Sequence, residues 1–249
     1  MIKVGIIGGS GLEDPEILKQ PELESVSTPY GEPSSPLISG MIKGVKTVIL
    51  SRHGKKHTIP PTQVNNRANI WSLKEAGCSH IIATTACGSL RQEIGRGDIV
   101  IPDQFIDYTR HRDITFFNEF EPGKMKHTPM ADPFNLKLRE AIISSASRCD
   151  ISVHEKGTII TIEGPRFSTR AESRMFRIWG ADLINMSTSP EAILANEAGI
   201  PYAAIAMSTD YDSWKEDEEP VSWEEVLKVF QSNVDKVLKL ILETIPYVS

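Results

Sequence analysis

Short apolar segments alternate with capped helical segments along most of this chain, and this alternation is the feature that most constrains its fold. Eight segments are predicted as strands, at residues 3–7, 36–40, 45–51, 81–83, 98–101, 157–162, 182–186 and 202–207. Strands that alternate with helices favour a parallel sheet covered on both faces. We therefore predict an α/β fold with a central mixed, largely parallel β-sheet flanked by helices.

Turn and capping residues set the expected bounds of the other elements. A turn at 43–44 joins two of the predicted strands, and a helix over 67–76 stops at Gly77. The other predicted helices begin at a capping residue. One runs from Asp132-Pro133 to about Cys149, and another from Ser189-Pro190 to Gly199. Two more follow capping boxes at 169–172 and 222–225, and the second of these is a long amphipathic C-terminal helix.

Composition narrows the class of protein. The chain has 249 residues, of which 40% are hydrophobic and 24% charged, so it can bury a large core. No repeat or low-complexity linker divides it, and a single domain over residues 1–249 is the simplest interpretation. The net charge is −6 without a dense basic tract, which argues against nucleic acid as a partner.

The cysteines and the hydropathy pattern indicate the cellular compartment in which the protein is expected. Three cysteines, Cys78, Cys87 and Cys149, are scattered and form no Cys-x-x-Cys pair, which suits free thiols in a reducing compartment. No apolar run approaches the roughly 18 residues that a membrane-spanning helix needs. We expect a cytoplasmic protein without a membrane partner.

Small polar residues follow four of the predicted strands, at 84–89, 163–168, 186–189 and 208–212. In open α/β sheets, ligands bind outside the carboxyl ends of the strands. Some of these hydroxyl residues are explained as helix caps, namely Thr169, Ser189 and Ser222, but capping does not explain Thr84-Thr85 or the two aspartates at 210 and 212. We therefore expect the ligand site at these strand ends.

The sequence Gly8-Gly9-Ser10-Gly11 after the first strand has three interpretations. A dinucleotide fingerprint needs Gly or Ala at position 14, where Asp14 stands, so a nicotinamide-dependent oxidoreductase is disfavoured. A small anion nest would hold one phosphate with backbone N–H groups and the Ser10 hydroxyl. A plain tight turn remains the other alternative.

Arg52-His53-Gly54 follows another apolar strand. An arginine at a strand end with a donor beside it suits bidentate binding of phosphate, whereas a surface ion pair is the common alternative. His53 and His57 have a spacing that binds metals on a helix, but Gly54 and Pro60-Pro61 disfavour a helix there. We therefore expect no metal site.

Asp210 and Asp212 flank Tyr211 after the last predicted strand. In extended backbone, residues i and i+2 point to the same side, so both carboxylates can face one ligand. One member of such a pair in a closed pocket is held protonated as a donor. A solvated acidic turn leading into Lys215 is the alternative.

Five motifs together carry a resemblance that spans nearly the whole chain. They are Arg52-His53-Gly54, Thr84-Thr85-Ala86-Cys87-Gly88-Ser89, Glu163-Gly164-Pro165-Arg166-Phe167, Asn185-Met186 and Thr209-Asp210-Tyr211-Asp212. In this order they resemble the trimeric purine nucleoside phosphorylase family, which includes enzymes that act on methylthioadenosine. The resemblance implies phosphorolysis of 5′-deoxy-5′-methylthioadenosine to adenine and 5-methylthioribose 1-phosphate. It also implies a homo-oligomer, either trimer or hexamer, with phosphate as co-substrate and no metal or organic cofactor.

The resemblance also implies a role for individual residues. Asp210, Asp212 and Ser187 form the expected catalytic set, with Asp210 protonating N7 of the purine and Asp212 facing its 6-amino group. The expected phosphate ligands are Ser10, Arg52, His53, Thr85, Ser187 and the backbone of Ala86. The expected nucleoside contacts are Phe167 and Ser168 at the base, Met186 at the ribose, and His57 with a neighbouring subunit's His127 near the 5′ end.

Substrate choice is where the sequence departs from the family pattern and where alternatives stay open. Relatives acting on 6-oxopurines tend to carry Asn where Asp210 stands, which favours a 6-aminopurine substrate here. Trp223 stands where the resemblance implies a smaller aliphatic residue beside the methylthio group. The alternative functions are a broader purine nucleoside phosphorylase acting on adenosine or inosine, a nicotinamide-dependent oxidoreductase, and a non-catalytic purine sensor.

Overall fold

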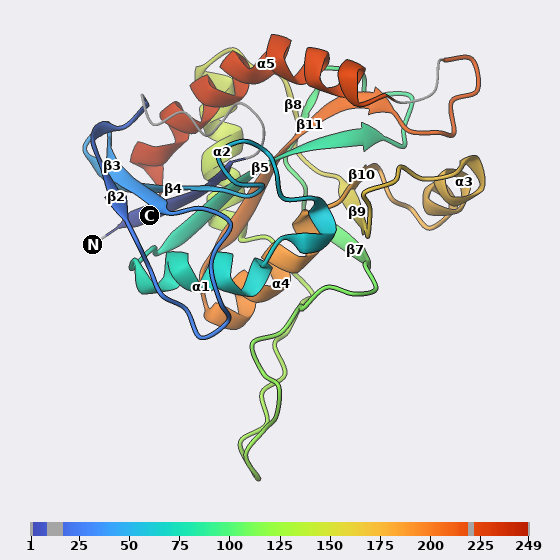
Figure 1. Ribbon diagram of the computed structural model, residues 1–249. Helices are drawn as coiled ribbons and strands as arrows, with labels where there is room; N and C mark the ends of the chain where they lie inside the picture. The colour runs from blue at the N-terminus through green and yellow to red at the C-terminus, as the bar shows by residue number, and fades with distance from the viewer. Residues whose placement is uncertain (1, 9–16, 219–221, 249) are drawn as a thin grey trace.

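Strand β5 (His80–Ser89) is the strand to which three different parts of the sheet attach. The computed structural model describes residues 2–8, 17–218 and 222–248 (Figure 1). Within them, β5 runs parallel to β1 (Lys3–Gly8) on one side and to β11 (Tyr202–Tyr211) on the other. Its last two residues pair antiparallel with β10 (Leu183–Asn185). The sheet therefore changes strand direction at the end of β5.

The remaining strands extend the sheet on both sides of β5. Their order is β2-β3-β4-β1-β5-β10-β9-β7, with β11, β6 and β8 branching from β5. Of the ten pairings among the described strands, six are parallel, which confirms the predicted mixed, largely parallel sheet. The other strands are β2 (Lys19–Glu24), β3 (Leu37–Ile42), β4 (Val45–Ser51), β6 (Ile99–Val100), β7 (Gln104–Tyr108), β8 (Val153–His154) and β9 (Thr158–Ile162).

Helices cover both faces of this sheet, as the alternation predicts (Figure 1). On one face α1 (Asn66–Glu75) packs against α4 (Thr188–Ala198), and on the other α2 (Leu136–Arg148) packs against α5 (Trp223–Thr244). Each face of the sheet has its own apolar core, and the strand side chains alternate between the two. Tyr202 and Ala204 belong to the first core, and Ala203 and Ile205 belong to the second. The period of two along a strand thus divides the apolar residues between two cores. Further helices among the described residues are α3 (Arg170–Ile178), η2 (Pro61–Gln63) and η3 (Ile245–Tyr247).

Strand bounds differ from the prediction where polar residues continue a strand. β5 extends through Ser89 and β11 through Tyr211, so the hydroxyl residues at 84–89 and Asp210 lie within strands rather than after them. The parallel pairing of β5 with β11 continues through all of these residues, and it satisfies their backbone groups whatever the side chains are. β2, β7 and β8 lie in segments that the sequence did not predict as strands.

Two predicted helix starts are wrong. α2 begins at Leu136, because Asn135 rather than Asp132 is the N-cap and accepts a hydrogen bond from the Leu138 N–H at 3.0 Å. Ser189 lies inside α4 rather than capping it. Its N–H donates to Thr161 Oγ1 at 3.0 Å, so strand β9 supplies the acceptor that a capping side chain would provide. The capping box at Thr169 and Glu172 is confirmed.

Among the described residues, no helix is long and apolar enough to cross a membrane.

The position of the α2 cap gives a test of the corrected helix start. We predict that Asn135→Ala lowers the free energy of unfolding by about 1 kcal/mol, because it removes the side-chain acceptor for the Leu138 N–H. Asp132→Ala is the matched control and changes it by less than about 0.5 kcal/mol, since Asp132 is exposed outside the helix. Urea unfolding of both variants measures this, and equal losses would contradict the assigned cap.

Candidate functional site

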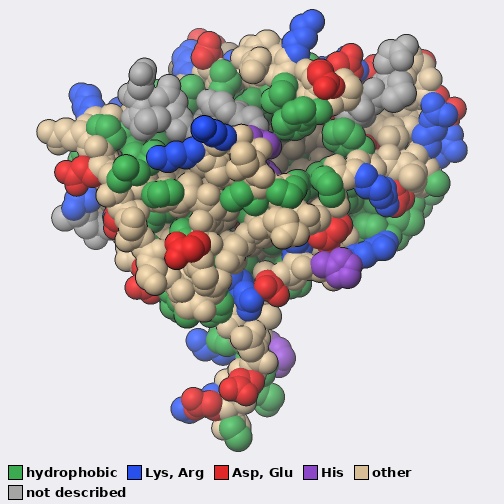
Figure 2. Space-filling view, in the orientation of Figure 1, with side chains coloured by type: hydrophobic (Ala, Val, Ile, Leu, Met, Phe, Trp, Pro, Cys, Tyr) green, Lys and Arg blue, Asp and Glu red, His purple; other side chains and the backbone are tan. Residues whose placement is uncertain are grey.

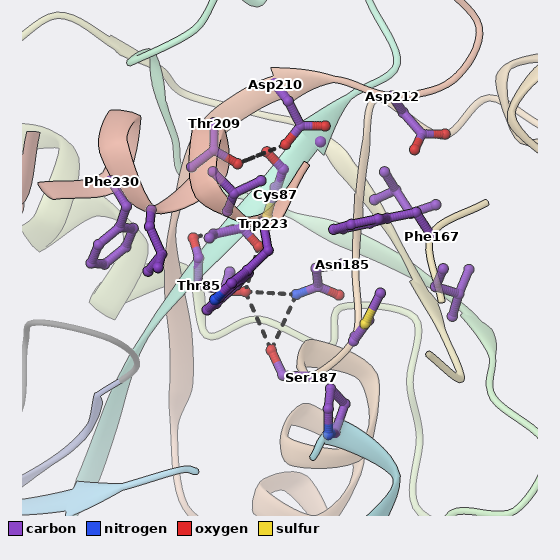
Figure 3. Close-up of a pocket in the computed structure, with 18 of the residues that line it drawn as sticks. Thr85, Cys87, Phe167, Asn185, Ser187, Thr209, Asp210, Asp212, Trp223 and Phe230 are labelled. Atoms are coloured by element: carbon purple, nitrogen blue, oxygen red, sulfur yellow. Dashed lines mark hydrogen bonds between the residues drawn. The ribbon is translucent and has the colours of Figure 1, made fainter. Parts of the chain in front are cut away.

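A cavity lies over the carboxyl half of β5, between the carboxyl ends of β10 and β11 and the start of α5. Figure 2 shows a hollow in this face, and Figure 3 shows the side chains within it. Its empty volume is about 950 Å³, including space open to solvent. Eleven of the thirteen predicted site residues line it, namely Arg52, His53, His57, Thr85, Ala86, Phe167, Ser168, Met186, Ser187, Asp210 and Asp212.

The cavity lies where the site was expected, because residues at or directly after the carboxyl ends of β4, β9, β10 and β11 line it. β10 runs antiparallel to β5, so its carboxyl end turns back along β5 instead of reaching the same edge of the sheet. Asn185 and Ser187 therefore meet Thr85, four residues before the end of β5. The change in strand direction concentrates the polar side chains over the centre of the sheet.

Hydroxyl groups gather at one end of the cavity around the side chain of Asn185, which is buried. Its amide Nδ2 donates to Thr85 Oγ1 at 3.0 Å and approaches Ser187 Oγ at 3.4 Å (Figure 3). Thr161 Oγ1 in turn donates to Asn185 Oδ1 at 2.8 Å, which fixes the orientation of the amide. Thr85 Oγ1 and Ser187 Oγ lie 3.3 Å apart. Asn185 thus holds the two hydroxyls side by side at this end of the cavity.

Arg52 enters the same end of the cavity with its guanidinium held in place. The side chain is 3% exposed, its Nε and Nη2 donate to the Glu191 carboxylate at 2.5 and 3.1 Å, and its Nη1 donates to the Thr84 carbonyl at 2.9 Å. The Tyr202 hydroxyl donates to Glu191 Oε2 at 2.9 Å. This planar two-point pairing orients Arg52 at the site, so the surface ion pair considered from the sequence is wrong.

His53 and His57 follow Arg52 and stack on each other, with ring centroids 4.4 Å apart. Burial, reinforced by the Arg52 charge, lowers the pKa of His53 to about 4. His53 is therefore neutral at pH 7, and its Nδ1 donates to the Ile59 carbonyl at 2.8 Å, which we assign because a carbonyl only accepts. Burial also lowers the pKa of His57. No cluster of three or more potential metal ligands occurs in the part of the chain that the structure describes.

Two buried carboxylates occupy the opposite end of the cavity. β11 has a bulge between Ser208 and Asp210, which places Asp210 opposite Gly88 of β5. A Cβ atom on Gly88 would lie 3.0 Å from Asp210 Oδ2, so the glycine leaves room for the carboxylate. Asp212 follows on the same side, and both carboxylates line the cavity.

The surroundings of these carboxylates favour the protonated form of Asp210. Burial raises its pKa to about 6 and the neighbouring Asp212 charge adds to the rise, although Thr209 Oγ1 donates to Asp210 Oδ1 at 2.8 Å and opposes it. Burial also raises the pKa of Asp212, opposed by the hydroxyl of Ser168, which donates to Asp212 Oδ2. Asp210 is therefore suited to donate a proton near neutral pH.

An aromatic and a thioether side chain line the wall between the two ends. The Phe167 ring faces the cavity near Asp212 and is 39% exposed (Figure 3). Met186 packs over Gly164, where a Cβ atom would lie 2.4 Å from its sulfur. Arg112 donates to the Met186 carbonyl at 3.3 Å and to the Glu163 carbonyl at 2.6 Å, so it fixes the backbone beneath this wall.

Two predicted site residues do not line the cavity. Ser10 lies outside the described residues. His127 lies on residues 119–130, a segment without helix or strand that we call the arm and that projects from the body of the molecule (Figure 1). Its ring contacts Phe120 on the same arm, with centroids 6.0 Å apart.

Sequence reasoning did not assign a role to Glu191, Asn185 or Arg112. Glu191 sits in the first turn of α4, where an acidic residue is expected for any helix. Asn185 belongs to the Asn185-Met186 motif, and its position at the end of a predicted strand is the sequence feature that indicates a functional role. Nothing in the sequence distinguishes Arg112 from the other arginines near it.

Comparison with known proteins identifies the relatives of this chain. A profile described as "Phosphorylase superfamily" matches residues 3–246. The chain is 58% identical to the S-methyl-5′-thioadenosine phosphorylase of Xenopus tropicalis over 252 residues, which cover 100% of this chain and 89% of that protein. It is 55% identical to the enzyme of the same name from Danio rerio, over 99% of this chain and 89% of that one.

Solved structures show the same likeness. A methylthioadenosine phosphorylase from Schistosoma mansoni in complex with adenine superposes with a TM-score of 0.93 at 44% identity, covering 99% of this chain and 91% of that chain. A variant adenosine/methylthioadenosine phosphorylase from the same organism, in complex with methylthioadenosine, superposes with a TM-score of 0.92 at 43% identity and the same coverage.

The Arg52–Glu191 pair gives a test of what stabilises the end of the cavity that holds Arg52, Thr85 and Ser187. We predict that Glu191→Gln lowers the free energy of unfolding by about 3 kcal/mol, because it removes the carboxylate charge opposite a buried guanidinium. Asp113→Asn is the control, since it breaks the ion pair of Arg67 with an Asp113 carboxylate that is 71% exposed, and it costs less than about 1 kcal/mol. Urea unfolding measures both, and a loss in Glu191→Gln as small as the control's would show that the pair does not hold this end.

Proposed function

Because the chain belongs to the phosphorylase superfamily, we propose that it catalyses phosphorolysis of 5′-deoxy-5′-methylthioadenosine to adenine and 5-methylthioribose 1-phosphate. The observation that carries the proposal is the division of one cavity into an anion end and a carboxylate end. The names of the Xenopus and Danio relatives support the substrate. Such a reaction salvages both the purine and the methionine-derived sulfur.

The proposed roles follow from what each end holds. Phosphate binds between the Thr85 and Ser187 hydroxyls and the Arg52 guanidinium, with His53 as a neutral neighbour. Ser10 and the Ala86 backbone complete this set of proposed phosphate ligands. The purine lies at the other end with Asp210 and Asp212, Phe167 packs on the base together with Ser168, and Met186 contacts the ribose.

The chemistry then needs one bond to form and one to break. A phosphate oxygen bonds to C1′ while the bond between C1′ and N9 breaks, and its electron pair moves into the purine. Protonated Asp210 donates its proton to N7, so adenine leaves as a neutral molecule. The phosphate dianion also stabilises the positive charge that develops at C1′. Holding both reactants in one cavity removes the entropic cost of their encounter.

We further propose that the chain is a single domain and forms a homo-oligomer, a trimer or hexamer, in which His127 of one subunit reaches the 5′ end of a neighbour's site. The projecting arm supports this proposal, because it carries His127 away from its own cavity (Figure 1). The three cysteines are free and buried, which supports a reducing compartment such as the cytoplasm.

A second candidate is a broader nucleoside phosphorylase that also accepts adenosine. The name of a solved relative, adenosine/methylthioadenosine phosphorylase, favours it. Inosine is disfavoured under either proposal, because an ionised Asp212 facing the 6-position repels the 6-carbonyl group.

The first experiment compares adenine release from methylthioadenosine with and without phosphate, alongside adenosine and inosine. We expect release that requires phosphate and is fastest with the methylthio nucleoside. Equal kcat/KM for adenosine would establish the broader enzyme instead. Absence of release from every nucleoside, with phosphate present, would overturn the proposed reaction.

A substitution tests the proposed acid. We predict that Asp210→Asn lowers kcat with methylthioadenosine by roughly 10²–10⁴-fold, because the amide cannot deliver a proton. It also shifts the preference from adenosine toward inosine, since an amide N–H donates to a 6-carbonyl group. An unchanged ratio of adenosine to inosine turnover would remove Asp210 from the base site.

The pH profile provides a second readout of the same variant. The pKa of Asp210 is raised to about 6 and the protonated form is the acid, so kcat/KM falls as the pH rises through about 6. This fall is expected to vanish in Asp210→Asn. If it persists at the same pH in the variant, another group titrates and Asp210 is not the acid.

A further inference from the structure

The side-chain amide of Asn185 faces three hydroxyl groups with its nitrogen. Its Nδ2 donates to Thr85 Oγ1 at 3.0 Å and approaches Ser187 Oγ at 3.4 Å (Figure 3). The same nitrogen donates to Thr188 Oγ1 at 2.6 Å. All four side chains are buried. The half of the amide that carries the two protons therefore faces the hydroxyl pair of Thr85 and Ser187.

The other half of the amide contacts Thr161, which belongs to β9. Thr161 Oγ1 accepts a hydrogen bond from the Ser189 N–H at 3.0 Å and donates to Asn185 Oδ1 at 2.8 Å. In the reverse orientation the amide nitrogen would face Thr161, and the Thr161 proton would lose this acceptor. Thr161 thus stabilises the observed orientation of the amide. It is fully buried and does not line the cavity.

The orientation of the amide matters because a hydroxyl group has a single proton. As oriented, the amide donates toward the oxygens of Thr85 and Ser187, so these hydroxyls need not donate to it and keep their own protons for other acceptors. If the amide were turned over, its oxygen would accept those protons. It would then compete with an anion in the cavity for the same donors.

Inside the protein, the Thr85 proton has two acceptors in reach. The Ala86 carbonyl lies 3.2 Å from Thr85 Oγ1, and Ser187 Oγ lies 3.3 Å from it. Both distances exceed the roughly 2.7–2.8 Å that is usual for hydrogen bonds between oxygens. An ionised acceptor forms shorter and stronger hydrogen bonds than a neutral one. A bound oxyanion is therefore the better acceptor for this proton.

We propose that Asn185 is a positioning residue for the phosphate co-substrate. Its amide, oriented by Thr161, keeps the protons of the Thr85 and Ser187 hydroxyls available to a tetrahedral oxyanion. This inference rests on the proposed function, which places phosphate between these two hydroxyls. Thr161 acts on the anion only through the amide, so the network sets the affinity for phosphate and leaves the affinity for the nucleoside unchanged.

A purely structural role for the same contacts has a different signature. Thr161 also accepts the Ser189 N–H in the first turn of α4, so it links β9 to that helix. If this link is its whole role, loss of the hydroxyl affects phosphate and nucleoside alike, whether or not Asn185 is present. If Thr161 orients the amide, its loss affects phosphate alone and only while Asn185 is present. A double-mutant cycle separates the two roles.

The experiment measures the KM for phosphate, the KM for methylthioadenosine, and kcat. It compares the wild-type chain with Thr161→Val, which removes the hydroxyl and keeps the branched shape, with Asn185→Ala, and with the double variant. Thr47→Val is the matched control, because Thr47 is equally buried in the same sheet, donates to the Val45 carbonyl at 3.2 Å and does not line the cavity. Calorimetric titration with inorganic phosphate measures the same affinity without turnover.

We expect Thr161→Val to raise the KM for phosphate by about tenfold, the scale of one hydrogen bond to a charged group. The KM for methylthioadenosine and the kcat at saturating phosphate change by less than about twofold. Asn185→Ala also raises the KM for phosphate, and adding Thr161→Val to it changes that value by less than about twofold. Thr161→Ser, which retains the hydroxyl, and Thr47→Val both keep the wild-type KM for phosphate.

Three results would overturn the inference and leave the proposed function intact. They are an unchanged KM for phosphate in Thr161→Val, an equal rise in the KM values for phosphate and nucleoside, and an effect of Thr161→Val that persists in full without Asn185. Wild-type adenine release that does not require phosphate, or no release at all, rejects both proposals. Thermal unfolding shows which variants are folded, and Thr161→Ala replaces Thr161→Val if the latter is not.

Discussion

The parallel pairing of β5 with β11 is the constraint on which the rest of the site depends. It continues from Tyr202 opposite Ile81 to Tyr211 opposite Ser89, past the point where the side chains become polar. Backbone hydrogen bonds therefore hold Thr85 and Asp210 on neighbouring strands within the sheet. Residues on loops are held less firmly than residues on paired strands. The bulge before Asp210 then re-aims its carboxylate into the space above Gly88. A rigid sheet thus fixes the separation between the anion end and the carboxylate end.

The fold class could be predicted because apolar periodicity and helix caps are local signals. The strand at residues 45–51 and the capping box at Thr169 are examples of elements predicted from them. Most of the predicted site residues line one cavity because they stand at or near the ends of strands. Strand direction was the missing information, since the antiparallel turn of β10 depends on packing between distant segments. The same holds for Glu191, whose partner Arg52 lies 139 positions away along the chain. Its burial follows from the tertiary fold, and a first-turn glutamate carries no local sign of it.

Different elements supply the walls of the cavity. The anion end is tied by Asn185 and by the two-point pairing of Arg52 with Glu191. The carboxylate end belongs to β11. The cavity wall at Trp223, Val226 and Phe230 instead comes from the first turns of α5, where Phe230 belongs to the core between the helix and the sheet. The proposed phosphate and purine ligands are therefore held by the sheet, whereas this wall belongs to a helix.

The buried position of Asp210 in the cavity lowers the stability of the folded state. Its pKa is about 6 in the folded chain and 3.8 is its ordinary value, so the folded state binds the proton more tightly than the unfolded state does. Stability is therefore greatest below about pH 4 with respect to this group, and it falls as the pH rises toward and through 6. Above that range the ionised, buried carboxylate disfavours folding by on the order of 2–3 kcal/mol. An asparagine would fit the same space without this cost, yet it has no proton to give. The destabilising carboxylate is also the proposed proton donor to the leaving purine, so stability and proton donation set opposite demands on one side chain.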